Sequence, residues 1–449
     1  MKKYLFKNIA YLATFDEMGE VENAYLVVEG NRISYIGTEE PKGNFDRVID
    51  CSNKIMLPGF INTHHHLYQS LTRNVKAVQN AKLFDWLVNL YEIWKNLDEE
   101  GAYVSAAVAA AEMALSGVTT TSDMLYLYPN GKNSLFDEEI KGVSLVGLRF
   151  YPTRGSMSMS KKDGGLPPDS VVQNEDEILS EYERAILKYH DRSKFAMVRV
   201  ALAPCSPFSV TESLMKETLE LAEKQDLLLH THLAETKDEE RFCIEKFGLR
   251  PVDYMEKIGW LNPRVWFAHL VHVNGEDIEK LRENDVGVSH CPSSNMRLGS
   301  GIAPIVKMKG LRVSLGVDGS ASNDTSNMIL EIRNALLLQR VKYGASAISS
   351  REALKLATVG GAEVLRIDDY VGTLKVGKAA DLIMFDLDKI GFAGALDDPL
   401  SAIVMCDAKQ VDFNMVNGDV IVENGELSVK NLKDLITRHN QISKKLIKG

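Results

Sequence analysis

The middle of the chain alternates short apolar runs with longer amphipathic stretches, and this alternation limits the possible folds more than any other feature. Between residues 55 and 366, eight runs of strand length are each followed by a segment with helical periodicity. This pattern is typical of parallel strands joined by helical crossovers. We expect the strands at residues 55–61, 119–123, 145–150, 195–200, 227–232, 265–269, 286–290 and 313–318.

The number of strand–helix units favours a closed barrel. Eight units in about 310 residues agree with an α/β fold of the (β/α)8 TIM type that carries insertions. A doubly wound open sheet is the competing α/β architecture. No GxGxxG sequence follows the first strand to support that alternative. We therefore predict the barrel.

Both ends of the chain are rich in short β-runs and tight turns. Gly30-Asn31 separates two apolar runs near the start, and Asn417-Gly418 does so near the end. Each segment is too short to bury a face alone, so we expect the two to pair as a small β-sandwich. The predicted division is residues 1–56 for the first part of the sandwich, 57–366 for the barrel, and 367–449 for the second part with a C-terminal helix.

The charge balance excludes two classes of partner. Lysine and arginine number 52 against 62 aspartates and glutamates, which gives a formal net charge of −10. Such a chain lacks the basic surface field that binds nucleic acids or anionic membranes. The most apolar helical stretch, residues 102–118, contains Glu112 and is too short to span a bilayer. We expect no nucleic acid and no membrane as partner.

The cysteines indicate the compartment. The chain has five, far apart and without a CxxC pair, so neither a disulfide framework nor a zinc ribbon is suggested. We expect a cytoplasmic protein.

Polar residues gather at the carboxyl ends of the predicted strands, where a barrel of this type places its chemistry. His64 and His66 stand two apart in an extended segment, so both point to one side while His65 points to the other. Several imidazoles with a carboxylate form a donor set that zinc accepts with a position left open for water. A single histidine is more often a packing residue. We expect His190 and His439, in polar helical stretches, to be solvated.

Two carboxylates near these histidines allow a structural or a functional interpretation. Asp318 follows an apolar run and could cap a helix, although Ser320 could serve equally well. Glu235 follows His232 by three residues and could be a first-turn acid. In the functional interpretation, Asp318 is a metal ligand and Glu235 is a proton donor.

Four segments together resemble the amidohydrolase superfamily, in the branch with guanine, triazine and S-adenosylhomocysteine deaminases. They are Pro58–His66, His232–Glu235, Ala268–His272 and Gly316–Gly319. The resemblance covers essentially the whole chain. It implies one divalent metal held by His64, His66, His232 and Asp318, with Zn²⁺ expected and Fe²⁺ or Mn²⁺ as alternatives. It also implies that Glu235, His269 and Asp318 are catalytic. Binuclear relatives use a lysine on the fourth strand, and residues 197–203 contain none, so we expect a mononuclear site.

Further segments resemble bacterial 8-oxoguanine deaminases and the related isoxanthopterin and hydroxytriazine aminohydrolases. They are residues 67–74, 83–87, 152–156, 203–209, 289–295 and 320–324. The resemblance implies hydrolytic deamination of an amino-substituted, purine-like heterocycle by a metal-bound hydroxide, with 8-oxoguanine and water giving urate and ammonia as the first choice.

The candidate substrate contacts are Gln69, Trp86, Arg154, Cys205 and Glu235. Many relatives carry a histidine where this chain has Cys205, which favours a neutral fused ring as substrate. Trp86 could equally belong to a helix core, and Cys205 could be a buried apolar residue. Arg154 is expected on a loop after the third strand, where it could lie over the substrate or pair with an acid.

Three alternatives to 8-oxoguanine deamination stay open. The substrate could be isoxanthopterin or a hydroxytriazine. The chain could be a hydrolase of the same architecture that attacks an ester, amide or chlorinated ring, which predicts a binuclear site or a different acid. It could also be a non-catalytic structural barrel, a role that usually requires loss of ligands. We expect a small heterocyclic substrate and, by resemblance, a homo-oligomer.

Overall fold

A closed barrel of parallel strands forms the centre of the computed structural model, which describes residues 1–448. Gly449, the last residue of the expected terminal segment, lies outside the described residues. The strands follow the order β14-β13-β12-β11-β10-β9-β8-β6. Their bounds are β6 Phe60–Asn62, β8 Val118–Leu125, β9 Arg149–Ser156, β10 Ala201–Pro204, β11 Leu229–Leu233, β12 Val265–His269, β13 Gly287–His290 and β14 Arg312–Leu315. The predicted (β/α)8 barrel is confirmed.

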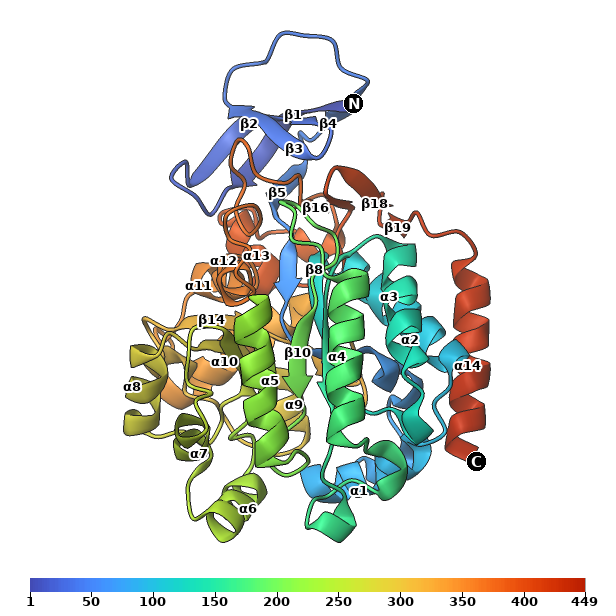
Figure 1. Cartoon of the computed structure of the whole chain (residues 1–449). Helices are drawn as coiled ribbons and strands as arrows, with labels where there is room; N and C mark the ends of the chain where they lie inside the picture. The colour runs from blue at the N-terminus through green and yellow to red at the C-terminus, as the bar shows by residue number, and fades with distance from the viewer. Residues whose placement is uncertain (449) are drawn as a thin grey trace.

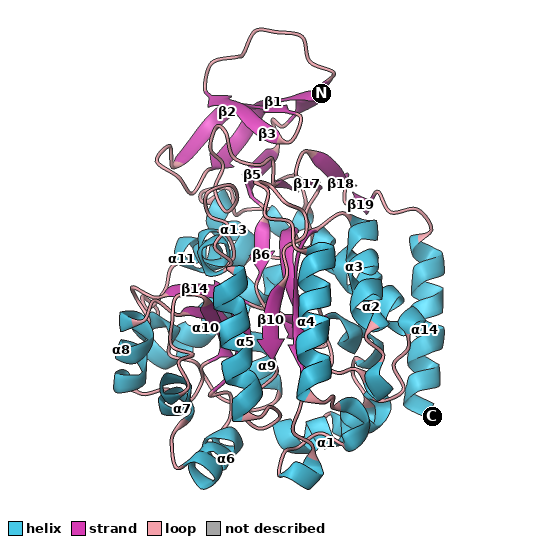
Figure 2. Cartoon of the chain, viewed as in Figure 1, coloured by secondary structure: helices cyan, strands magenta, loops and turns pink. Residues whose placement is uncertain are grey.

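Helices surround the barrel, as Figure 2 shows. Those that follow the first four strands are α1 Leu83–Trp94, α2 Glu99–Leu115, α3 Ser134–Val146, α4 Glu175–Tyr189 and α5 Glu212–Gln225. The later ones are α6 Lys237–Phe247, α7 Pro251–Lys257, α8 Gly275–Glu283, α9 Pro292–Arg297, α10 Met328–Tyr343, α11 Ser350–Leu356 and α12 Val359–Val364. A 3-10 turn, η1 Leu67–Thr72, follows the first barrel strand. In the described residues, no helix is both long and apolar enough to cross a membrane.

The two ends of the chain meet in one mixed sheet of nine strands at the amino-terminal end of the barrel (Figure 1). The N-terminal part supplies β1 Lys3–Ala13, β2 Glu20–Glu29, β3 Arg32–Gly37, β4 Arg47–Asp50 and β5 Lys54–Pro58. The C-terminal part supplies β16 Leu382–Asp386, β17 Phe413–Val416, β18 Asp419–Glu423 and β19 Glu426–Leu427. Antiparallel pairing of β5 with β16 joins the parts. Helix α13, Pro399–Met405, lies between β16 and β17, and α14, Leu432–Lys448, ends the described chain.

The first predicted strand is divided between the two sheets. Its start forms β5 in the terminal sheet and its end forms β6 in the barrel, with Gly59 between them. A Cβ atom at Gly59 would lie 2.0 Å from Cγ2 of Thr119 in β8, so only glycine allows the link between β5 and β6 to pass this close to β8.

The third and fourth strands differ from the prediction. The third was expected at 145–150, but Leu145 and Val146 end helix α3, Gly147 caps it with a φ of 90°, and β9 runs from Arg149 to Ser156. The fourth was expected at 195–200, whereas β10 begins at Ala201 and only Val198 bridges to β9 before it. Short apolar runs suit a helix end or a packed loop as well as a strand, so periodicity did not fix these strand ends.

A buried ion pair connects the barrel to the terminal sheet. The Arg149 guanidinium donates to Asp381 at 3.1 Å and to the carbonyl oxygens of Phe195 and Ala196 at 2.7 and 2.6 Å. Asp381 also accepts from the Asn417 amide at 2.7 Å. Because both side chains are almost wholly buried, each charge depends on the other.

We expect Arg149→Met to lower the free energy of unfolding by about 3–5 kcal/mol, because it leaves the Asp381 carboxylate buried and unpaired. Denaturant unfolding would measure the loss. Arg241→Met is the control: Arg241 pairs with Asp238 on α6 while its side chain is 70% exposed, so the change should stay within about 0.5 kcal/mol. Equal losses in both variants would contradict this role of the buried pair.

Helix α14 docks on the barrel through a buried histidine. His439, expected to be solvated, is only 8% exposed, and its Nε2 lies 3.0 Å from Ser70 Oγ in η1. Ser443 Oγ donates to the Leu71 carbonyl at 2.6 Å. His190 is half-buried, with Nδ1 3.1 Å from the Val200 carbonyl oxygen. Both expectations of solvation were wrong, because neighbouring elements cover these side chains.

Burial lowers the pKa of His439 from 6.5 to about 4. A histidine with a depressed pKa adds stability above its unfolded pKa and loses it as the pH falls toward the folded value. The free energy of unfolding should therefore fall between pH 6.5 and 4 more steeply for the native chain than for His439→Gln. Unfolding curves at pH 7, 5.5 and 4 would measure this, and parallel pH profiles would contradict it.

Candidate active site

Four predicted side chains converge at the carboxyl ends of the barrel strands. His64 and His66 come from the segment after β6, His232 from β11, and Asp318 from the turn after β14. Asp318 Oδ1 lies 3.3 Å from His64 Nε2 and 3.4 Å from His66 Nε2. His66 Nε2 lies 3.1 Å from His232 Nε2. Three nitrogens and one carboxylate oxygen thus face a single point.

The charges of this cluster suit a cation. Burial lowers the pKa of His64, His66 and His232, so at neutral pH their rings are uncharged. Burial acts to raise the pKa of the Asp318 carboxyl, but the histidines around it outweigh burial and hold that pKa well below its usual range. Neutral imidazoles and an ionised carboxylate are the forms that bind metals.

A buried nitrogen without a hydrogen-bond partner supports the interpretation of this cluster as a metal site. His64 Nε2 is buried and makes no hydrogen bond within the described residues, although it faces the other donors. A buried nitrogen without a partner is costly and calls for an explanation, which a metal bond provides. Cys291 lies close enough to His64 and His269 to form a second candidate group. Burial raises the pKa of its thiol well above the usual range, and the thiol is a poorer ligand than the thiolate.

Two histidines outside the cluster flank its members. His230 Nε2 lies 2.8 Å from His64 Nδ1, and His230 Nδ1 lies 2.8 Å from the Trp266 carbonyl oxygen. The His230 ring stacks on the Trp266 ring at 4.3 Å. His65 turns away from the cluster, as predicted, and its Nε2 lies 2.9 Å from Ser326 Oγ. Because the Trp266 carbonyl can only accept, His230 donates from Nδ1 and its Nε2 accepts from His64 Nδ1. This fixes the tautomer of His64 that leaves its Nε2 free to bind a metal.

Glu235 and His269 face each other beside the cluster. Glu235 Oε2 lies 3.5 Å from His269 Nε2, which is 4.0 Å from Asp318 Oδ2. Burial raises the pKa of Glu235 to about 7. Burial acts to lower the pKa of His269, but Glu235 and Asp318 raise it above the ordinary value. Asn295 Oδ1 lies 2.9 Å from His269 Nδ1 and holds the ring in place.

The turn that carries Glu235 is held by another carboxylate. Glu239 accepts hydrogen bonds from the amides of Ala234 and Glu235, both at 2.8 Å. Ala234, His269 and Asp318 all have a positive φ, at 53°, 77° and 59°. Side chains other than glycine rarely adopt this conformation, and such strain gathers where function requires it.

A small apolar slot opens above the cluster. Of the predicted substrate contacts, Gln69, Trp86, Cys205 and Glu235 line it. Arg154 does not: it lies in β9, fully buried, with its guanidinium 3.4 Å from the Tyr128 ring centre and bonded to Asn133 and Gln173 at 2.9 Å. The slot leaves about 30 Å³ free, so its wall must open for a bicyclic ring to enter.

Other lining residues were missed at the sequence level. The slot also includes Leu83, Leu87, Tyr91, Tyr126, Phe208, Leu298 and Ser322. Tyr126 follows β8 directly, so its place at the barrel rim could have been predicted. The positioning roles of His230 and Glu239 depend on tertiary contacts, for which the sequence carries no signal.

Comparison with known proteins identifies the family. A family model described as "Amidohydrolase family" matches residues 55–421, which is most of the chain. The chain belongs to the amidohydrolase family. The predicted family resemblance is therefore confirmed.

Several amidohydrolase relatives match over nearly their full length. 8-Oxoguanine deaminase of Pseudomonas aeruginosa is 48% identical over 442 residues, 98% of each chain. Isoxanthopterin deaminase of an unknown prokaryote is 32% identical and covers 97% of this chain and 94% of its own. The structure of atrazine chlorohydrolase from Arthrobacter aurescens complexed with zinc aligns with a TM-score of 0.93 at 30% identity, over 98% of this chain and 100% of the neighbour. Together with the histidine cluster, the zinc-complexed neighbour supports a divalent metal in this site.

The bond that His64 donates to His230 predicts a measurable effect on metal affinity. We expect His230→Phe to weaken Zn²⁺ binding about 10- to 100-fold, because the change removes the group that orients His64 while the ring can still stack on Trp266. Competition with a chelator would measure the affinity. His290→Phe is the control, because His290 is equally buried and its ring nitrogens make no hydrogen bond within residues 1–448. Equal weakening in both variants would contradict the role of His230.

Proposed function

We propose that this chain is a zinc-dependent aminohydrolase that converts 8-oxoguanine and water to urate and ammonia. One observation carries the proposal: the His64–His66–His232–Asp318 donor set lies next to a protonatable Glu235, below the slot. The relative named 8-oxoguanine deaminase, at 48% identity over 98% of each chain, supports the choice of substrate.

His64, His66, His232 and Asp318 would hold the metal, and the missing lysine on the fourth strand supports a single ion. When bound, a divalent cation lowers the pKa of a coordinated water and so supplies the nucleophile at neutral pH. Zinc suits three nitrogens and one carboxylate oxygen with a position left open.

The proton transfers are assigned to the two carboxylates. Asp318 accepts the proton of the attacking water at Oδ2, which Ser322 Oγ approaches to 3.3 Å. Glu235, with a pKa near 7, donates a proton to the ring nitrogen beside the attacked carbon. The carbon–nitrogen bond to the exocyclic amine then breaks, and the proton on Asp318 leaves with the ammonia. The carbon keeps the water oxygen as a carbonyl, and the remaining proton of that oxygen returns to Glu235, which restores the starting state of both carboxylates.

The remaining assigned residues bind and orient the ring. His269, held by Asn295, stabilises the oxygen on which negative charge develops. Trp86, Tyr126 and Phe208 line the slot and suit a planar ring. Gln69 and Cys205 are the proposed polar contacts within it, and Gln69 Oε1 is buried without a partner in the described residues.

Ammonia release tests the assignment. Zinc-loaded protein would be assayed with 8-oxoguanine, guanine, isoxanthopterin, cytosine and hydroxytriazines. We expect kcat/KM to be highest for 8-oxoguanine. A preference for isoxanthopterin or a hydroxytriazine would favour the alternatives within the branch, and no ammonia from any ring would overturn the proposed activity and favour a structural barrel.

Substitution of Glu235 and of His269, which lie beside the proposed metal ligands, tests the mechanism. Glu235→Gln and His269→Asn should each lower kcat at least about 100-fold, because each removes a group that acts in the transition state. Metal analysis should still give one zinc per chain. His272→Asn is the control, since its Nε2 contacts the Ser300 carbonyl oxygen and the residue does not line the slot. Normal turnover in either test variant would remove that residue from the mechanism.

We further propose a cytoplasmic homo-oligomer. The five cysteines are unpaired within the described residues, which suits a reducing compartment. Leu330, Leu337 and Val341 form an apolar stripe on α10 and are 43%, 38% and 83% exposed. Such a stripe suits contact with a second copy of the chain.

A further inference from the structure

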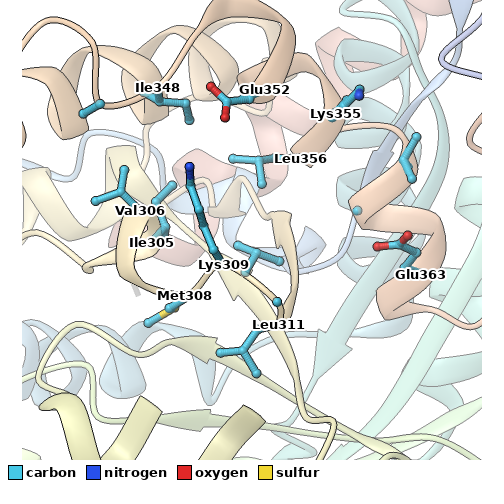
Figure 3. Close-up of a pocket in the computed structure, with 15 residues that line it drawn as sticks. Ile305, Val306, Met308, Lys309, Leu311, Ile348, Glu352, Lys355, Leu356 and Glu363 are labelled. Atoms are coloured by element: carbon cyan, nitrogen blue, oxygen red, sulfur yellow. The ribbon is translucent and has the colours of Figure 1, made fainter. Parts of the chain in front are cut away.

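A second cavity lies at the other end of the barrel, between the start of β14 and helices α11 and α12. Its volume is about 410 Å³, within the range of ligand sites. Figure 3 shows the side chains around it, from the turn before β14 below and from α11 and α12 above and beside it. None of its lining residues lines the slot above the histidine cluster.

The walls of this cavity are mostly apolar. Ile305, Met308, Val313 and Ile348 are 6%, 0%, 9% and 6% exposed, so most of their surface is already covered by the fold. All four line the cavity, together with Val306, Leu311, Leu356 and Val359. Apolar walls around a space of this size favour a ligand with an apolar body.

Two lysines add positive charge to these walls. Figure 3 shows Lys309 rising from the turn into the cavity and Lys355 at its rim. Within residues 1–448, neither ammonium has a carboxylate oxygen within 4.0 Å. Neither lysine is therefore held in a direct ion pair.

Two glutamates also line the cavity. The Glu352 carboxylate accepts bonds from Ser349 N and Oγ, both at 2.8 Å, and so caps helix α11. These bonds, and to a smaller extent the charges of Lys309 and Lys355, lower the pKa of its carboxyl. Partial burial raises the pKa of Glu363. Neither carboxylate forms a direct ion pair with either lysine.

We propose that this cavity is a second ligand site, and that it binds a small amphipathic anion with an apolar body and one carboxylate group. The apolar walls take the body, and Lys309 and Lys355 take the carboxylate. The site is independent of the proposed activity, because the two cavities share no residue.

Calorimetric titration of the full chain with three probes tests the chemistry. Octanoate, octanol and octyltrimethylammonium share an apolar tail and differ in charge. We expect octanoate to bind once per chain, octanol more weakly, and the cation most weakly of all. Absence of saturable octanoate binding, or binding of the cation as tightly as the anion, would overturn the proposal.

Variants place the binding in this cavity. Lys309→Gln and Lys355→Gln should each weaken octanoate binding about three- to fivefold and leave octanol unchanged. Lys307→Gln is the matched control, because Lys307 belongs to the same turn but lies over the Tyr343 ring, outside the cavity. Equal effects of Lys307→Gln and Lys309→Gln would contradict the assignment.

A variant that fills the cavity with a larger side chain tests the location of the site independently of the lysine charges. Val306→Trp, at a half-buried position, should abolish binding of both octanoate and octanol while thermal unfolding shows an intact fold. Unchanged octanoate binding in this variant would place the anion elsewhere and overturn the proposal. If the native chain bound no octanoate and Val306→Trp changed the oligomeric mass, the occupant of the cavity would be a second copy of the chain. That result would also overturn the proposal.

Discussion

The whole site depends on the closure of the barrel between its first and last strands. His65 and His66 pair with Asp318 and Gly319 in a short parallel bridge, and Asp318 N donates to the His64 carbonyl at 3.0 Å. Buried side chains of the strands hold this seam. Asn62 Oδ1 accepts from Val317 N at 2.9 Å, and Thr63 Oγ1 lies 2.7 Å from Ser314 Oγ. Ligands about 250 residues apart in the sequence are brought together because the seam fixes their backbones.

Two nearby buried carboxyl groups take different roles. Asp318 lies among histidines that keep it ionised, whereas burial raises the pKa of Glu235 to about 7. Two acids with separated pKa values are the arrangement that one base and one acid require at neutral pH. The left-handed backbone at His269 and Asp318 and the clamp from Glu239 show that the fold carries strain to keep these groups in place.

Periodicity and the positions of strand ends made the barrel and most of the site predictable from the sequence. His64, His66, His232, His269 and Asp318 were found because polar residues stand out where apolar runs stop. The strands expected at 145–150 and 195–200 were misjudged, because short apolar runs also occur at a buried helix end, as in α3, and in a packed loop, as before β10. Arg154 was consequently placed on a loop rather than inside β9. His230 and Glu239 were missed because their importance lies in contacts across the fold. His439 was misjudged because α14 covers it only in the folded chain.

Anomalous diffraction from crystals of the zinc-loaded protein tests the proposed metal centre most directly. We expect one anomalous peak per chain at the carboxyl end of the barrel, about 2.0–2.2 Å from His64 Nε2, His66 Nε2, His232 Nε2 and an Asp318 oxygen. Two peaks in this position, or a peak bound by Cys291 and His269 without Asp318, would contradict it.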